Sequence, residues 1–253
     1  MKKELQRLLS LAESTALAAG MQLVAHQAQW STVEVDAGRE VKVKADRLVE
    51  EMILDNLHAG SSFPVLSEER GWQDGIISDD YLWVVDPLDG SFNYLHNIPV
   101  CAVSIALYQG QNPILGVIYD FNRHELFSGV VAIGAWLNKR SIHVSEIQES
   151  ARGVLYTGFP TAKDFSDAHS VTFMRFARQW RKVRMIGSAA IALAYVACGR
   201  AEYYHERNTH FWDVAAGLAL VVAAGGQVQY FGDSLDAPQD VHAHNGQVVF
   251  QEL

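Results

Sequence analysis

Cysteine and long apolar runs are both scarce in this sequence. The two cysteines, Cys101 and Cys198, each lie in an apolar segment, so we expect buried free thiols. The first nine residues include basic residues but no sustained apolar run, which argues against a signal peptide. The most apolar later segment, 214–226, is too short and too rich in Gly and Ala for a membrane span. We therefore predict a cytoplasmic protein that does not contact a membrane.

Positive charge is also limited, with 20 Lys and Arg against 29 Asp and Glu and a formal net charge of −9. This balance argues against broad nucleic-acid binding, because attraction to phosphates needs a basic surface. An enzyme for anionic substrates would instead need bound divalent cations to invert the local charge. Hydrophobic residues make up 49% and charged residues 19% of the 253, as in a globular protein with a large core.

No linker rich in Pro or Ser and no internal repeat interrupts the chain. Helical patterns at 3–27 and 46–57 flank a polar connection. Strand patterns then dominate, at 82–86, 100–108, 114–119 and 125–131. From residue 154 the two types alternate, with strands at 154–157, 183–186, 201–204 and 227–230 and helices at 171–181, 188–198 and 213–224. The pattern predicts an α+β protein whose first half holds a mainly antiparallel sheet.

The run 83–91, Trp-Val-Val-Asp-Pro-Leu-Asp-Gly-Ser, joins an apolar strand to two carboxylates. A buried strand that ends in Asp86 needs a cation or several N–H donors at that end. Pro87 and Gly90 would let Asp86 and Asp89 face one site across a short loop, with the Leu88 carbonyl as a free oxygen ligand. The simpler alternative is a strand terminator followed by an ordinary Asp-Gly turn.

Three further segments favour a shared acidic site. Glu68 and Glu69 follow a short apolar strand at 63–65. Asp213 lies in the first turn of a mostly buried helix, where a lone Asp is usually an N-cap. Between them, Gly187 and Ser188 open a helix of small residues, where backbone N–H groups can hold an anion.

Together these motifs resemble the inositol monophosphatase family of lithium-sensitive, magnesium-dependent phosphatases. The resemblance covers nearly the whole chain and includes the segments 102–107, 116–120, 122–127, Thr157-Gly158-Phe159-Pro160 and Gly187-Ser188-Ala189-Ala190, in the family's order. It implies a layered α-β-α-β-α sandwich of the inositol monophosphatase and fructose bisphosphatase type. One compact unit would then contain a half at 1–150 with most metal ligands and a half at 151–253 with the substrate contacts.

The resemblance also implies a set of metal ligands. Glu68, Asp86 and the Leu88 carbonyl would hold one Mg²⁺, while Asp86, Asp89 and Asp213 would hold another. Mg²⁺ prefers oxygen ligands and keeps waters, which suits this set. Two cations about 3.5–4 Å apart can polarise a phosphoryl group, activate water and stabilise the leaving alkoxide. Two or three Mg²⁺ ions are expected, with Mn²⁺ as a substitute and Li⁺ or Ca²⁺ as inhibitors.

Catalytic residues follow from the same resemblance. Asp46 and Ser91 match the carboxylate and hydroxyl that orient the attacking water together with Glu68. Most relatives have Thr in place of Ser91, and Ser keeps the hydroxyl while losing the methyl that restricts its rotamer. Asp46 could also be the N-cap of the second helix. The backbone N–H groups of Gly90 and Ser91 are expected to bind phosphate oxygens.

Substrate contacts are expected at Glu206 and Ala189, which match positions that meet the ring hydroxyls in inositol phosphatases. A solvated loop is the competing interpretation for Glu206. Its neighbour Arg207 could meet a second phosphate or a carboxylate. The histidines are expected to be structural or solvent-facing, and their spacing predicts no zinc site; they include His96, His205, His210, His242 and His244.

The segment 42–46, Lys-Val-Lys-Ala-Asp, departs from the family pattern. It lacks the Thr that precedes the Asp in many relatives. The usual lysine of the mobile loop has no clear match, although Lys42 and Lys44 lie nearby. That loop contributes to a third, weaker metal site in relatives, so we expect an altered metal dependence.

The resemblance therefore predicts a magnesium-dependent phosphomonoesterase that hydrolyses inositol monophosphate or a related small polyol or sugar phosphate with a metal-activated water. Alternatives on the same scaffold are phosphatases of 3'-phosphoadenosine 5'-phosphate, fructose bisphosphate or histidinol phosphate. The Ser91-Phe92-Asn93 continuation favours the inositol group. An alternative of another class is a regulatory or binding protein with weakened catalysis. The expected partners are a small phosphorylated metabolite and a second copy of the chain.

Overall fold

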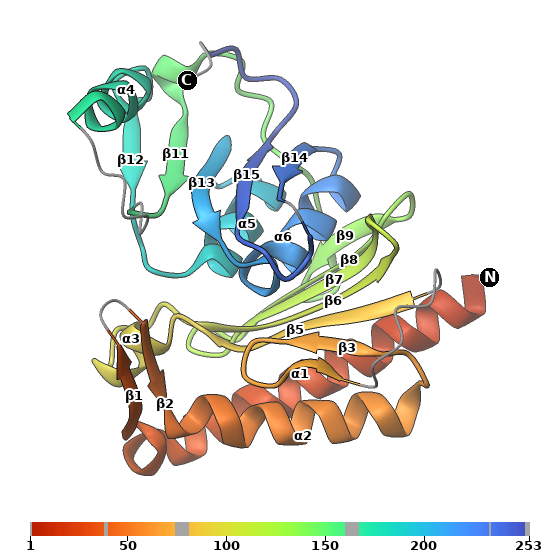
Figure 1. Cartoon of the computed structure of the whole chain (residues 1–253). Coiled ribbons are helices and arrows are strands. Elements are labelled where there is room, and N and C mark those ends of the chain that lie inside the picture. Colours follow the sequence, from red (N-terminus) through yellow and green to blue (C-terminus); the bar gives the residue numbers. More distant parts are fainter. Residues whose placement is uncertain (1, 38–39, 74–80, 160–166, 233, 251–253) are drawn as a thin grey trace.

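The computed structural model of the chain describes residues 2–37, 40–73, 81–159, 167–232 and 234–250. Five layers follow one another in Figure 1: α1 (Lys2–Trp30) with α2 (Lys44–Gly60), an eight-stranded sheet, α5 (Ala189–Ala197) with α6 (Phe211–Ala223), a five-stranded sheet, and α4 (Asp167–Ala177). This confirms the predicted α+β sandwich. No strand is shared between the two large sheets, while the division into halves at residue 150 stays a prediction.

Helices α1 and α2 form the first layer and pack on one face of the eight-stranded sheet. Both were predicted, and both extend beyond the predicted limits. Among the described residues, α1 alone is long and apolar enough to cross a membrane. The same length and composition occur in core helices, and the apolar stripe of α1 is buried against α2 and the sheet; it comprises Leu8, Leu9, Ala12, Ala16, Ala19 and Leu23. The helix is thus part of the core here.

The eight-stranded sheet has the order β10-β9-β8-β7-β6-β5-β3-β4 and is antiparallel except for the pair β3 and β5. Its strands are β3 (Val65–Ser67), β4 (Gly71–Gln73), β5 (Tyr81–Asp89), β6 (Ala102–Gln109), β7 (Asn112–Asp120), β8 (Glu125–Val130), β9 (Gly134–Leu137) and β10 (Arg140–Ile142). The first five residues of β5, 81–85, are apolar, as is typical of a strand that is covered on both faces. Trp83 and Val85 pack toward α1 and α2, whereas Leu82 and Val84 join the core that contains α5 and α6.

Several short strands were not predicted from the sequence. The polar connection between α1 and α2 is an antiparallel hairpin of β1 (Val33–Ala37) and β2 (Glu40–Val43). It stands beside α3 (Ser91–Leu95) in Figure 1. Strands β4, β9 and β10 were also missed, because three or four partly polar residues give no clear alternation. The hairpin matters for the site because β2 delivers Lys42 and leads directly into Asp46.

The five-stranded sheet has the order β12-β11-β13-β15-β14. Its strands are β11 (Val154–Thr157), β12 (Lys182–Arg184), β13 (Tyr203–Thr209), β14 (Gln227–Phe231) and β15 (Gln239–His244), preceded by a 3₁₀ turn at Ser150–Arg152. Strand β11 matches its prediction, β15 was missed, and β13 begins two residues later than expected. Helix α4 ends earlier than expected, at Ala177, because the chain then turns back so that Trp180 can pack against Phe176.

Helix α6 lies unusually close to both of its neighbours. A Cβ at Gly116 of β7 would overlap the Ala216 carbonyl oxygen of α6, and a Cβ at Gly217 would overlap Leu193 of α5. These glycines therefore allow the helix to touch the sheet backbone and α5 directly. Because α6 is held at this distance, its first turn, which carries Asp213, has a fixed position relative to the strand ends.

The variant Gly116→Ala should lower the melting temperature, because its methyl group would force α6 away from the sheet. Overpacking of this kind costs about 1–3 kcal/mol, or several degrees in a chain of this size. Thermal unfolding followed by circular dichroism measures the change. Gly110→Asn is the matched control, since Gly110 has a positive φ that Asn tolerates and open space around it. Equal melting temperatures for Gly116→Ala and the wild type would contradict this packing.

Candidate active site

The predicted acidic residues come together at the ends of strands and helices from four segments of the chain. A cavity of about 350 Å³ lies there, and three of the predicted site residues with acidic side chains line it: Asp89, Glu206 and Asp213. The remaining lining residues are Thr157, Gly158, Phe159, Met185, Ile186, Gly187, Ser188, Ala189, Ala192, Tyr204 and Thr209. Pro160, the last residue of one family segment, lies outside the described residues. The structure therefore places Asp89, Glu206 and Asp213 at one cavity, while their roles in binding metal and substrate remain predictions.

A β-bulge places the side chains of Asp86 and Asp89 on the same side of the sheet. Residues three apart on a regular strand face opposite sides of the sheet. Asp86 pairs with Ser104 and Asp89 pairs with Ala102, so β5 carries one extra residue between these pairs. Strand β5 therefore continues through Pro87 to Asp89, and the predicted loop between the two carboxylates is a bulge. Proline is tolerated there because the ladder is already interrupted.

Hydrogen bonds hold the bulge together. The Leu88 amide donates to Asp86 Oδ1 at 3.0 Å, and the Ser91 hydroxyl lies 2.9 Å from the Leu88 carbonyl oxygen. The prediction of a free Leu88 carbonyl is therefore wrong in part, although a carbonyl oxygen has a second lone pair. Gly90 follows with a φ of 92°, and a Cβ there would lie 2.9 Å from the Val100 carbonyl oxygen. Only glycine fits this turn without strain.

Asp89 sits at the N-terminus of α5. Its Oδ2 accepts a hydrogen bond from the Ser188 hydroxyl and another from the Ala190 amide at 2.8 Å, while the Ala189 amide lies 3.3 Å from Oδ1. The sequence predicted that this helix start could hold an anion, and the anion is the carboxylate of Asp89. Ala189 was expected to contact substrate near its backbone, but its amide already faces Asp89.

Asp213 is fixed in a similar way at the start of α6. It is the third residue of the helix, and its Oδ2 accepts from the Thr209 hydroxyl at 3.0 Å and the His210 amide at 3.1 Å. The N-cap is His210, whose ring stacks on Trp212 with centroids 4.6 Å apart. The structural role expected for His210 therefore fits its position, and Asp213 is not the N-cap.

Glu68 and Glu69 follow β3, as expected, and the backbone after Glu68 is held from α2. The buried carboxylate of Glu50 accepts from the Glu69 amide at 3.0 Å and the Arg70 amide at 3.3 Å. Lys42 of β2 forms an ion pair with Glu69 at 3.0 Å. The hairpin thus places a lysine beside the acidic cluster, although no lysine could be matched clearly to the family pattern from the sequence.

Asp46 and Ser91 are in direct contact, as the resemblance implied. Their side-chain oxygens lie 2.6 Å apart, and the other oxygen of Asp46 accepts from the Val43 amide at 2.6 Å. Asp46 is the third residue of α2 and Val43 is the N-cap, so the alternative N-cap assignment for Asp46 is wrong. Its side chain nevertheless satisfies an N-terminal amide while facing Ser91.

Glu206 lies on strand β13, which excludes the solvated-loop alternative. Its Oε2 accepts a hydrogen bond from the buried Tyr204 hydroxyl at 2.6 Å, and its carboxylate lies against Gly158, where a Cβ would overlap it. Arg207 points to the other face of the sheet and lines a different cavity, so it does not supply a charge to this site. The supporting residues Tyr204, Thr209 and Glu50 were missed, because only the tertiary fold brings them to the predicted groups.

Burial and mutual repulsion disfavour the ionised carboxylates. Burial raises the pKa of Asp89 to about 7, against the hydrogen bond from Ser188 and with a contribution from Asp213. It also raises the pKa of Asp46 to about 7. The pKa values of Glu68 and Asp86 lie well above the usual range, because both groups are buried and face other carboxylates. Lys42 offsets part of this repulsion.

These donors fit a hard divalent cation in their chemistry. All are oxygens, and Asp86 Oδ2 and Asp213 Oδ1 accept no hydrogen bond from any described residue. A cation would also relieve the repulsion that raises their pKa values. Among the residues that the structure describes, no three His, Cys, Asp or Glu side chains are arranged to hold a metal ion. The carboxylates are therefore gathered but still turned toward protein donors.

Known proteins of the inositol monophosphatase family match this chain over nearly its full length. The sequence model of the inositol monophosphatase family matches residues 4–252. Inositol-1-monophosphatase from Synechocystis is 37% identical across 99% of this chain and 88% of that protein. Nus factor SuhB from Xylella fastidiosa is 38% identical across 88% of this chain and 82% of its own length. The structure of inositol monophosphatase from Anabaena superposes with a TM-score of 0.83 at 35% identity, covering 96% of this chain and 92% of that one.

Fold, acidic site and relatives together define a hydrolase, specifically a phosphatase. The chain belongs to the inositol monophosphatase family. Members of this family are generally metal-dependent.

Replacing Glu206 by Gln should stabilise the metal-free protein at alkaline pH. Burial raises the pKa of Glu206 to about 7, with a contribution from Asp213 and against the hydrogen bond from Tyr204. The folded state therefore favours the protonated carboxyl, and wild-type stability falls as the pH rises from about 4 to 7. Glutamine has no charge to bury and can still accept the Tyr204 hydrogen bond.

We expect Glu206→Gln and wild type to melt alike near pH 5. At pH 8 the variant should be more stable by about 1–3 kcal/mol. Thermal melts in EDTA across this range make the measurement, and a difference independent of pH would contradict the raised pKa.

Proposed function

We propose that this chain is a Mg²⁺-dependent phosphomonoesterase acting on inositol monophosphate or a related small polyol or sugar phosphate. The main support is the gathering of Asp89, Asp213 and Glu206 around one cavity, next to the bulge that carries Asp86. A cavity with acidic walls would repel a phosphate ester unless cations were bound. The proposal is also supported by relatives named inositol-1-monophosphatase.

The proposed ligands for the cations are Glu68, Asp86, the Leu88 carbonyl, Asp89 and Asp213. When bound, Mg²⁺ would neutralise the phosphate charge and supply an acidified water as the nucleophile. The altered metal dependence expected from the segment 42–46 remains part of this proposal. Lys42 already offsets negative charge at Asp46, Glu68 and Asp213. Measuring turnover as a function of Mg²⁺ concentration tests the altered metal dependence. A saturation curve identical to that of a conventional relative would contradict it.

The Asp46–Ser91 pair can hold the proton that an attacking water releases. The Ser91 hydroxyl has one hydrogen, yet it lies within hydrogen-bond distance of both Asp46 and the Leu88 carbonyl. If Asp46 carries a proton, it can donate to Ser91 while Ser91 donates to Leu88. A pKa of about 7 lets Asp46 gain and lose that proton at neutral pH.

The remaining residues bind and orient the substrate. We propose that the Gly90 and Ser91 amides, at the start of α3, bind phosphate oxygens. The Glu206 carboxylate would accept hydrogen bonds from substrate hydroxyls. The hydrogen bond from Tyr204 orients this carboxylate, and Gly158 leaves the space that it occupies. A polyol with several hydroxyl groups suits such an acceptor.

Phosphate release from a substrate panel tests the proposal. The panel contains inositol 1-phosphate, fructose 1,6-bisphosphate, histidinol phosphate, 2'-AMP and 3'-phosphoadenosine 5'-phosphate, each with and without Mg²⁺. We expect Mg²⁺-dependent turnover with inositol 1-phosphate preferred. Asp213→Asn should lower kcat at least about 100-fold, whereas the exposed Asp55→Asn should not. If the enzyme prefers another compound of the panel, the proposed substrate is wrong. Full activity of Asp213→Asn would refute the metal mechanism.

Variants at Ser91 test the proton pair separately. Ser91→Ala removes the hydroxyl between Asp46 and Leu88 and should lower kcat by about 10- to 1000-fold. Ser91→Thr keeps the hydroxyl and restricts its rotamer, so it should retain turnover. Steady-state kinetics measures both effects. Full activity in Ser91→Ala would exclude the hydroxyl from proton transfer.

A regulatory role is a second candidate, because relatives from Xylella fastidiosa and Escherichia coli are named Nus factor SuhB. Stabilisation by Mg²⁺ without turnover of any panel substrate would favour it over the enzyme. We also propose a homodimer, as is common among relatives. Size-exclusion chromatography with light scattering should give twice the mass of one chain, and a monomer would contradict this.

A further inference from the structure

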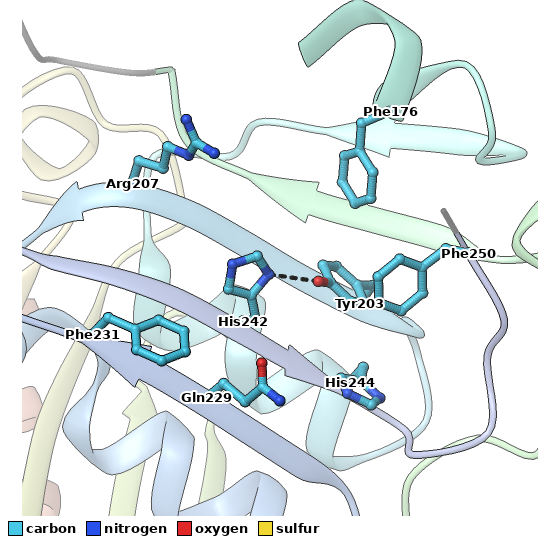
Figure 2. A pocket seen from close by; sticks show the side chains of 8 residues that line it. All are labelled: Phe176, Tyr203, Arg207, Gln229, Phe231, His242, His244 and Phe250. Carbon is cyan, nitrogen blue, oxygen red and sulfur yellow. Dashed lines mark hydrogen bonds between the residues drawn. The ribbon is translucent and has the colours of Figure 1, made fainter. Parts of the chain in front are cut away.

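A second cavity, of about 270 Å³, lies on the face of the five-stranded sheet that carries α4 (Figure 2). It shares no lining residue with the candidate active site. The lining side chains come from β13, β14, β15, α4 and the C-terminal segment: Phe176, Tyr203, Arg207, Gln229, Phe231, His242, His244 and Phe250. Neither the proposed reaction nor the family motifs use any of them.

Strand alternation separates this cavity from the catalytic one. Successive side chains of a strand point to opposite faces. On β13, Tyr204 and Glu206 face the candidate active site, so Tyr203 and Arg207 face the opposite side. One strand thus supplies side chains to two different cavities.

The floor of the cavity is aromatic and held in place by its own contacts. The Tyr203 hydroxyl lies 2.6 Å from His242 Nδ1, and the two groups are drawn together in Figure 2. His242 stacks on His205 with ring centroids 4.4 Å apart, and Tyr203 stacks on His244 at 5.7 Å. Flat ring faces at fixed positions favour a flat ligand.

Two exposed polar side chains, Arg207 and Gln229, lie at the rim of the cavity. The Arg207 guanidinium forms a long, exposed ion pair with Asp240 at 4.0 Å and makes no hydrogen bond to any described residue, so most of its N–H donors can bind a ligand. The exposed amide of Gln229 offers one acceptor and two donor hydrogens. Beside them, Phe231 is 62% exposed, so one side of its ring is open to a ligand in the cavity.

We propose that this cavity binds a small heteroaromatic anion of mononucleotide size, with its ring among Phe231, His242 and Tyr203 and its phosphate on Arg207. A nucleobase supplies a flat ring for the aromatic floor and an edge with donors and acceptors for Gln229. A single phosphate matches the single arginine. An aliphatic polyol phosphate, the substrate class proposed for the other cavity, would leave the aromatic floor without a stacking partner.

Calorimetric titration of the full chain with AMP in EDTA tests the proposal, because chelation removes the cations needed for phosphate binding at the acidic site. We expect one AMP per chain, adenosine at least tenfold weaker, and no binding of inorganic phosphate. Arg207→Ala and Phe231→Ser should each weaken AMP at least tenfold. Both side chains are exposed, so both variants should fold, which circular dichroism checks.

Two control variants locate the site. Arg178→Ala removes an exposed arginine that does not line the cavity, and Asp89→Asn changes the acidic site. Neither should alter AMP binding. The proposal fails if AMP does not bind, if adenosine binds equally well, if Arg207→Ala and Phe231→Ser bind normally, or if Asp89→Asn abolishes binding. AMP should also shift the ring proton resonances of His242 and His244, and unchanged resonances would contradict the location.

Discussion

The main physical constraint on this structure is the electrostatic repulsion among the buried carboxylates of the candidate active site. Glu68, the pair Asp86 and Asp89, and Asp213 are brought together from three segments; burial raises the pKa of all four carboxyls, and neighbouring carboxylates raise those of Glu68, Asp86 and Asp89 further. The surrounding structure supplies partial compensation. The bulge amide supports Asp86, the first turn of α5 supports Asp89, and the first turn of α6 supports Asp213. These donors do not remove the repulsion, and a bound cation, as proposed above, would offset more of it.

Close packing fixes the relative positions of the elements that carry these carboxylates. Gly116 lets α6 rest on the sheet, and Gly90 lets the chain leave β5 in a tight left-handed turn toward Ser91. The amide of Asn93 then donates to the Val100 and Ile186 carbonyls at 2.7 and 2.8 Å. This residue joins the bulge segment to the segment before α5. The two parts of the acidic site are thereby connected by a buried polar side chain in addition to apolar packing.

Apolar patterns in the sequence predicted an α+β protein and placed Asp86, Asp89 and Asp213 at the ends of elements, whereas the layered fold and the shared ligand set were implied by the family resemblance. The sequence was insufficient where tertiary contacts decide. The bulge at Pro87 looked like a loop, and Asp46 looked like an N-cap although it is the third residue of α2. The amides expected to bind an anion at α5 are occupied by Asp89, a pairing between residues 100 positions apart.

The central claim is that the carboxylate cluster requires a cation to be ionised and stable. Its most direct test is the melting temperature of the wild-type protein with saturating Mg²⁺ and with EDTA, measured between pH 5.5 and 8. Because protonated carboxyls bind cations weakly, the stabilisation by Mg²⁺ should be small at pH 5.5 and grow toward pH 8. A melting temperature that does not respond to Mg²⁺ at pH 8 would contradict the account.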